Sequence, residues 1–201
     1  MIRVEAVPEP AAFDARCRQR GLAWLATHEG PADERLGRPH DYWSEFRPEL
    51  AAAFEYRCAY LAMWIRSGTV DHFESWAGAG GAAKAYEWSN YRYADHALNS
   101  AKKPAWDGRL IDPFEVGDEW FEVLLPSCLL RIVEDRIPPA VLPRVHFTVQ
   151  KFGLDRREDI VAYRREWLRM HEQEGLSLEG LRRKAPLVAK AVESRALSAP
   201  R

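Results

Sequence analysis

Cysteine is scarce in this chain. Its 201 residues contain three cysteines, Cys17, Cys58 and Cys128, and no Cys-x-x-Cys pair. This count excludes a disulfide framework and a four-cysteine zinc site, and it indicates a reducing compartment. The chain also lacks an apolar run near the roughly 18–20 residues that span a membrane. Its first residues, MIRVEAVPEP, have no apolar segment like that of a signal peptide, so we expect a cytoplasmic protein with no membrane partner.

Net charge is also small, at −1 for the whole chain. A strongly basic, histone-like protein and an acidic tail are therefore both excluded. The balance hides an asymmetry, because residues 1–150 carry 17 basic and 22 acidic side chains, whereas residues 151–201 carry 12 and 8. Two interpretations of the basic C-terminal part stay open: ordinary solvated helix faces, or a surface that meets a polyanion.

Hydrophobic periodicity and turn residues predict an α+β fold, with a helical start, a mixed middle and a helical end. The predicted parts are residues 1–57, 58–135 and 136–201. Helices are expected over residues 10–27, from Asp41 to about 54, over 94–103, and in three segments after 138. Short β-branched or aromatic stretches predict strands at 68–73, 120–124 and 129–133, and a second strand or an extended turn at 86–93. We expect Asp41 to act as the N-cap of the second helix, Asp155 and Ser177 to act as N-caps of C-terminal helices, and Pro186 to kink the last helix.

The middle part holds a group of polar residues suited to chemistry. Asp71 and His72 are adjacent at the end of a predicted strand, and Asn99 lies in the helix that follows the next strand. A hairpin with a helix packed across it brings the three together. Their carboxylate and amide oxygens suit a hard ion such as Mg²⁺ or Mn²⁺, and a neutral His72 can take a proton from water. The set predicts metal-assisted hydrolysis of phosphodiester bonds.

Each of these residues also has a plainer interpretation. Asp71 and His72 alone are typical of a capped surface turn, and Asn99 alone is typical of an exposed helix position. Asp107 and Asp112 are expected to be turn and strand-end residues rather than metal ligands, and most of the eight tryptophans are expected in the core.

Basic and aromatic side chains lie close to this group in the sequence. Arg92, Lys102 and Lys103 are candidates for contacts with neighbouring phosphates. Lys102 and Lys103 are equally typical of a helix end, where they complement the helix dipole. Trp76 stands in a Gly/Ala/Ser loop, where it can stack on a base or a partner.

The spacing of these motifs resembles that of HNH endonucleases, in the Asp-His … Asn … Asn form. The matching segments are residues 69–73, 86–92 and 99–102. The resemblance implies a ββα-metal core flanked by helices, with Asp71 and Asn99 as metal ligands and His72 as general base. Asn90 corresponds to the structural middle asparagine, and we expect it to tie the hairpin loop together. The implied activity is a metal-dependent endonuclease that binds nucleic acid, with double-stranded DNA as the expected substrate.

Two departures from the family pattern affect this interpretation. Many HNH proteins brace the motif with a four-cysteine zinc knuckle, but here Cys58 alone matches, and Leu61, Asp95 and Leu98 stand at the other positions. No structural zinc is therefore expected, although a residual metal site from Cys58, Asp95 and His96 stays open. Residues 74–78 also lack the Pro and Lys that the family commonly carries there.

Three functional hypotheses follow. Segments 110–114 and 120–123 resemble a subgroup of bacterial HNH proteins, some of which resemble nucleases of anti-phage systems. The first hypothesis is therefore an active endonuclease in antiviral defence. The second is a catalytically weak, HNH-like binding or regulatory subunit, motivated by the lost zinc ligands. The third is a nuclease that works only with a partner such as an ATPase subunit.

Overall fold

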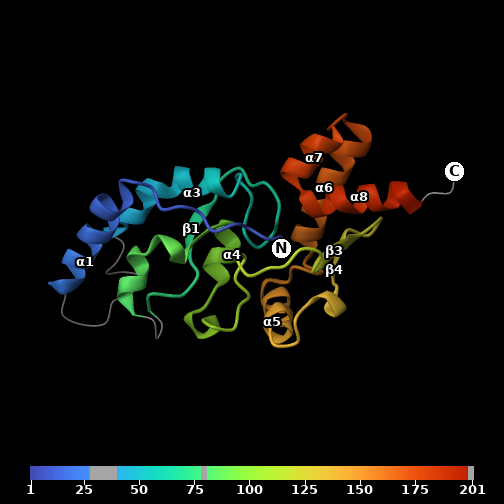
Figure 1. Ribbon diagram of the computed structural model, residues 1–201. Coiled ribbons are helices and arrows are strands. Elements are labelled where there is room, and N and C mark those ends of the chain that lie inside the picture. Colours follow the sequence, from blue (N-terminus) through green and yellow to red (C-terminus); the bar gives the residue numbers. More distant parts are fainter. Residues whose placement is uncertain (28–39, 78–80, 199–201) are drawn as a thin grey trace. The chain divides into compact units, whose positions relative to one another are not determined.

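The computed structural model describes residues 1–27, 40–77 and 81–198, and it combines helices with two small antiparallel sheets (Figure 1). The predicted α+β class is therefore confirmed. The chain forms two compact units, each assembled from separated segments. We call residues 5–56 and 67–108 the hairpin unit, and residues 1–4, 57–66 and 109–201 the helical unit. Among the described helices, none is long and apolar enough to cross a membrane.

Helices of the hairpin unit precede and follow its strands. Short 3₁₀ or π turns lead into two of them, and the helices are α1 (Gln19–Ala26), α3 (Arg47–Ala53) and α4 (His96–Ala101). Asp41 precedes the turn that leads into α3, but its carboxylate accepts a hydrogen bond from the Ser44 hydroxyl rather than from a helix backbone N–H. The expected cap at Asp41 is therefore wrong.

Two antiparallel strands, β1 (Thr69–His72) and β2 (Tyr91–Ala94), form the sheet of this unit. In their register, Asp71 lies opposite Arg92 and His72 opposite Tyr91. The second strand starts later than predicted, because the residues before it form two 3₁₀ turns, Ala82–Tyr86 and Trp88–Asn90.

Helix α4 begins one residue after β2 and packs against β1. The Asp95 carboxylate accepts hydrogen bonds from the backbone N–H groups of Ala97 and Leu98, which caps the helix. Leu98 is fully buried, so one face of this short helix is fixed in the core. The same helix therefore carries Asn99 at a defined position beside β1.

Aromatic packing holds the hairpin unit together. The Phe13 ring lies edge-to-face with Phe46, Trp88 and Tyr91, at centroid distances of 5.1 to 5.6 Å. Edge-to-face pairs at this distance stabilise a core beyond their buried area. All four of these aromatic residues are buried, so they form part of the core of the hairpin unit.

The helical unit contains the second sheet and the remaining helices. Its strands are β3 (Phe121–Leu124) and β4 (Leu129–Ile132), and its helices are α5 (Leu142–Phe152), α6 (Glu158–Gln173), α7 (Leu178–Lys184) and α8 (Pro186–Ser198). The Ser177 hydroxyl caps α7 by accepting the Gly180 N–H, as predicted. Two other predictions for this unit are wrong. Asp155 pairs with Arg156 and does not cap α6, and Pro186 starts a new helix rather than kinking one.

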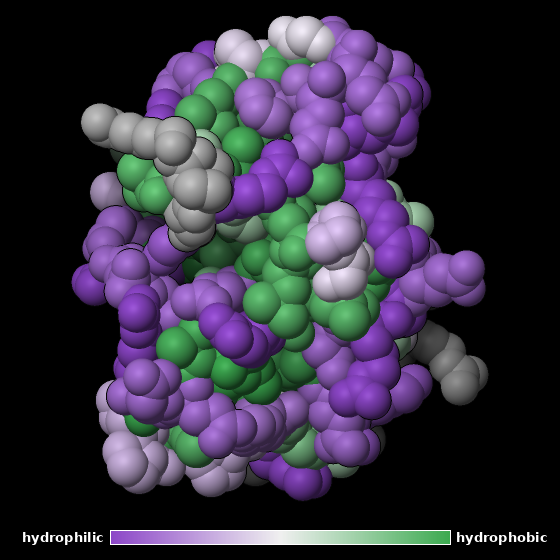
Figure 2. Space-filling view, turned by 90° about the vertical axis from the view of Figure 1, so that its right-hand side faces the viewer, coloured by the Kyte–Doolittle hydropathy of each residue, from purple (hydrophilic) through white to green (hydrophobic). Residues whose placement is uncertain are grey.

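Of the eleven Lys and Arg side chains within residues 151–198, six form an ion pair with an acidic residue. The ion pairs are Arg156–Asp155, Arg157–Asp159, Arg169–Glu166, Arg182–Glu193, Lys190–Glu119 and Arg195–Glu172. This pairing favours solvated helix faces over a basic surface for a polyanion. In the view onto the side where α8, β3 and β4 are labelled, hydrophobic residues gather between hydrophilic ones (Figure 2). Exposed leucines of this unit include Leu124 and Leu129, which pair with each other at the turn end of the β3–β4 hairpin.

Candidate active site

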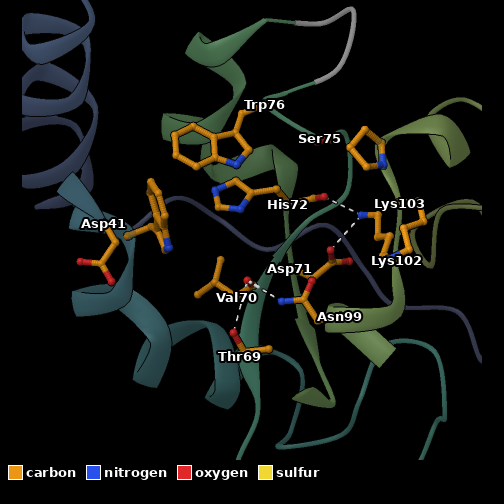
Figure 3. Close-up of a pocket in the computed structure, with 12 residues that line it drawn as sticks. Asp41, Thr69, Val70, Asp71, His72, Ser75, Trp76, Asn99, Lys102 and Lys103 are labelled. Atoms are coloured by element: carbon orange, nitrogen blue, oxygen red, sulfur yellow. Dashed lines mark hydrogen bonds and ion pairs between the residues drawn. The ribbon is translucent and has the colours of Figure 1, made fainter. Parts of the chain in front are cut away.

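A pocket of about 320 Å³ opens beside β1 in the hairpin unit (Figure 3). Six of the residues singled out from the sequence line it: Asp71, His72, Trp76, Asn99, Lys102 and Lys103. The segments that supply them are β1, the loop that follows it, and α4 with its C-terminal end. These six residues, which lie up to 32 positions apart in the sequence, therefore face one cavity.

The Asp71 carboxylate forms a buried ion pair at one side of this pocket. Its side chain is 1% exposed and that of Lys102 is 6% exposed, and Lys102 Nζ lies 2.8 Å from Asp71 Oδ1. The same ammonium donates a hydrogen bond of 2.5 Å to the backbone carbonyl of His72. An internal cation therefore already sits where two oxygens of β1 converge.

The His72 imidazole is half-buried and held in one tautomer. Its Nε2 lies 3.0 Å from the carbonyl oxygen of Ala85, which can only accept, so Nε2 carries the proton and Nδ1 has the free lone pair. Burial lowers the pKa of His72 to about 4, with Asp71 opposing this shift and Lys102 adding to it. The ring is therefore neutral near neutral pH and can accept a proton.

Asn99 connects α4 to β1. Its Nδ2 donates to the carbonyl oxygen of Val70 at 3.3 Å, which directs the amide nitrogen toward the strand. The amide oxygen Oδ1 is then the atom of this side chain that is left for a ligand in the pocket. Asn99 is half-buried, so it differs from the exposed helix position of the plainer interpretation.

Asn90 and Arg92 lie outside the pocket lining. The buried Asn90 side chain accepts from Glu74 N–H at 2.8 Å and donates to the carbonyl oxygens of Glu74 and Lys84, which ties the loop to β2. Arg92 is 3% exposed, and its guanidinium donates to the backbone carbonyls of Ser89 and Tyr91. The structure therefore does not bring Arg92 to the place where we expected a phosphate.

Aromatic rings surround His72, and one of them was not predicted. Trp43, which lines the pocket, lies edge-to-face with His72 at 4.6 Å and with Trp76 at 5.6 Å. Trp76 is 9% exposed, and its ring stacks on that of His72 at 6.2 Å. Trp43 precedes His72 by 29 residues, so only tertiary packing relates them, and no local sequence pattern could have identified it.

Asp107 is a second acidic residue near the pocket. Its Oδ2 accepts the Ser75 N–H at 2.9 Å, whereas its buried Oδ1 has no hydrogen-bond partner among the described residues. Burial raises the pKa of Asp107, while the Ser75 N–H and Lys102 oppose that shift. The sequence predicted a turn residue here, and its proximity to Lys102 comes from the fold.

The four positions of the family's zinc knuckle do not all belong to one unit. Cys58 and Leu61 are in the helical unit, whereas Asp95 and Leu98 are in the hairpin unit. In the described part of the chain, no group of three or more His, Cys, Asp or Glu side chains could hold a metal ion.

The pocket combines three chemical properties. Asp71 and Asn99 supply oxygen atoms that can bind a cation, His72 can accept a proton, and Lys103 at the rim can attract an anion.

Comparison of the chain with protein-family models, curated proteins and solved structures finds no match.

Proposed function

We propose that this protein is a metal-dependent endonuclease that hydrolyses phosphodiester bonds in nucleic acid, with DNA as the expected substrate. The observation that carries the proposal is the shared pocket of Asp71, His72 and Asn99. Asp71 and His72 lie on β1 and Asn99 lies on α4, and the chain order β1, β2, α4 supports an interpretation of these elements as the ββα-metal core that the resemblance to HNH endonucleases implies.

In this proposal, His72 takes a proton from the attacking water. The hydrogen bond from Nε2 to the Ala85 carbonyl leaves Nδ1 as the accepting atom and fixes the plane of the ring. The rings of Trp43 and Trp76 pack against the imidazole and restrict its motion. Because the ring is already fixed, less orientational entropy is lost when the water and the phosphate bind.

The oxygen donors of the pocket fit a hard divalent ion. Asp71 would supply a carboxylate oxygen and Asn99 its Oδ1, and one carboxylate with one amide leaves room for water and phosphate. A bound Mg²⁺ or Mn²⁺ would supply positive charge beside the scissile phosphate. The contact of Lys102 with Asp71 and the His72 carbonyl supports this location, because an ammonium already occupies it as a cation.

The test is cleavage of supercoiled plasmid DNA by the full chain with Mg²⁺ or Mn²⁺. We expect wild type to nick the plasmid and His72→Ala to lose nearly all of that activity. His146→Ala is the matched control, since His146 is an exposed histidine paired with Glu134 and outside the pocket. Equal cleavage by wild type and His72→Ala would remove His72 as the base.

A second candidate function is a binding or regulatory subunit with weak or no catalysis, acting in a complex with a partner such as an ATPase. The closed Lys102–Asp71 pair favours it, because a buried ammonium at the carboxylate competes with a metal ion. A titration of Mg²⁺ and Mn²⁺, followed by the melting temperature, separates the two candidates. No binding of either ion would favour the regulatory subunit.

A further inference from the structure

The two sides of the pocket differ in chemistry. Asp41 and Trp76 lie on one side of His72, and Lys102 and Lys103 lie on the other (Figure 3). Trp43 adds to the aromatic side, because its ring contacts both His72 and Trp76. The pocket therefore has an aromatic side with an acidic rim, a reactive middle and a cationic side.

The two tryptophans differ in how accessible they are. Trp76 is 9% exposed and its ring is stacked on His72, so it forms part of the pocket wall and leaves little of its ring for a ligand. Trp43 is half-buried and lines the cavity, so part of its ring remains for a ligand. A flat apolar surface of this kind binds nucleobases, because every base has a π-face.

The two lysines differ in the same way. Lys102 is buried and its ammonium is paired with Asp71. Lys103 is exposed at the pocket rim and makes no ion pair with another residue in the described part of the chain. An incoming phosphate therefore meets Lys103 first, while the exposed Asp41 carboxylate repels phosphate from the aromatic side.

The size of the cavity limits what can enter. Its volume of about 320 Å³ lies at the lower end of the range for small-ligand pockets, roughly 300–1,000 Å³. A base inside a duplex is stacked on both faces and must leave the stack before it can contact a pocket wall. A single nucleotide with an unstacked base fits both the size and the chemistry of the walls.

We propose that this pocket binds one unpaired nucleotide, with its base against Trp43 and its phosphate toward Lys103. The preferred nucleic acid is then single-stranded or locally unpaired, and intact duplex is a poor ligand. This inference refines the substrate of the proposed nuclease, but binding itself requires neither metal nor cleavage. The scissile phosphate would lie between the base and Lys103, beside His72.

The test is binding by the full chain in EDTA, measured by fluorescence anisotropy of a labelled oligonucleotide. A single strand of mixed sequence is compared with a blunt duplex of the same sequence. We expect the single strand to bind at least about tenfold more tightly, which corresponds to one stacked base of intermediate strength. Equal or tighter binding of the duplex by wild type would overturn the inference without any variant.

Variants locate the binding site. We expect Trp43→Leu to weaken single-strand binding by roughly 5- to 150-fold, the range for loss of one base–aromatic stack, and Trp43→Phe to retain most of it. Trp24→Leu is the matched control, because Trp24 is half-buried and stacked on His40 at 4.4 Å, away from the pocket lining. Unchanged binding by a folded Trp43→Leu would overturn the assignment. If that variant does not fold, Lys103→Met serves instead, and unchanged single-strand binding by it would count equally against the site.

The two proposals fail in different ways. Trp43-dependent binding of single strands, combined with no cleavage in Mg²⁺ or Mn²⁺, would leave the nucleotide site standing and remove the nuclease. His72-dependent cleavage of plasmid, combined with binding that favours duplex and does not depend on Trp43, would do the reverse.

Discussion

Replacing Lys102 with methionine tests whether a lysine and a metal ion share one position. The Lys102 ammonium contacts Asp71 Oδ1 and the His72 carbonyl oxygen, and its Nζ lies 5.4 Å from the centroid of the Phe73 ring. Methionine keeps an apolar stem of similar length and removes the charge. The Asp71 carboxylate, 1% exposed, would then lose its counterion while the surrounding packing changes little.

The magnitude follows from the burial of both groups. Removing one partner of a buried ion pair costs about 3–5 kcal/mol, because the other charge stays buried without compensation. For a chain of this size, each kcal/mol lowers the melting temperature by roughly 2–4 °C, so we expect a fall of about 6–20 °C. A divalent ion at a concentration of 100 times its Kd raises the free energy of unfolding by about 2.7 kcal/mol, provided that it binds the folded state alone.

The assay is a thermal melt of wild type and Lys102→Met with increasing Mg²⁺ or Mn²⁺. Because no ammonium has to be displaced, we expect the ion to raise the melting temperature of the variant more than that of wild type. Lys190→Met is the control, since Lys190 pairs with Glu119 in an exposed position, and we expect its melt and metal response to match wild type. Asp71→Asn combined with Lys102→Met should recover much of the lost stability and lose the metal response. An equal metal response in wild type and Lys102→Met would refute competition between the lysine and the ion.

Three further substitutions test how the site is held in place. Asn90→Ala removes three hydrogen bonds to backbone groups in a buried position, and we expect a loss of about 1–3 kcal/mol in urea unfolding; an unchanged midpoint would contradict this role. Asp95→Ala removes the cap of α4 at a cost of about 1 kcal/mol, whereas Asp95→Asn should retain most of it, and equal stabilities for the two would count against the cap. Gly21→Ala places a Cβ 2.2 Å from the Tyr86 ring, so we expect a loss of about 1–3 kcal/mol by the same measurement, and a variant as stable as wild type would show that the ring moves freely.

Local sequence patterns were sufficient to predict most secondary structure. The segment 69–72, which starts with the β-branched Thr69 and Val70, forms β1, and the largely apolar segments 121–124 and 129–132 form β3 and β4. Gly153 ends α5 in the left-handed conformation that favours glycine, with φ of 65°. These features depend on a few adjacent residues, so the sequence alone identifies them.

Other features depend on competition that a local pattern does not resolve. Pro186 lacks a backbone N–H, and this suits the first turn of a helix as well as a kink, so the choice depends on where the preceding helix ends. Asp155 is followed directly by Arg156 in the sequence. Its carboxylate pairs with that arginine and does not accept a hydrogen bond from the backbone N–H groups at the start of α6. Trp43 reaches the candidate site only because α3 and its leading turn fold back on β1.

The charge that the folded pocket presents also differs from the charge that a count of its residues in the sequence would indicate. Counted along the sequence, Lys102 and Lys103 are two equivalent cations for a phosphate. In the fold, Lys102 neutralises the buried Asp71, so this pair contributes little field at the pocket mouth. The exposed Lys103 is then the lysine that attracts a phosphate, and salt screens the electrostatic interaction between the two. Binding at this pocket should therefore depend weakly on ionic strength, as expected for about one phosphate contact, and its affinity must come mainly from the aromatic wall around Trp43.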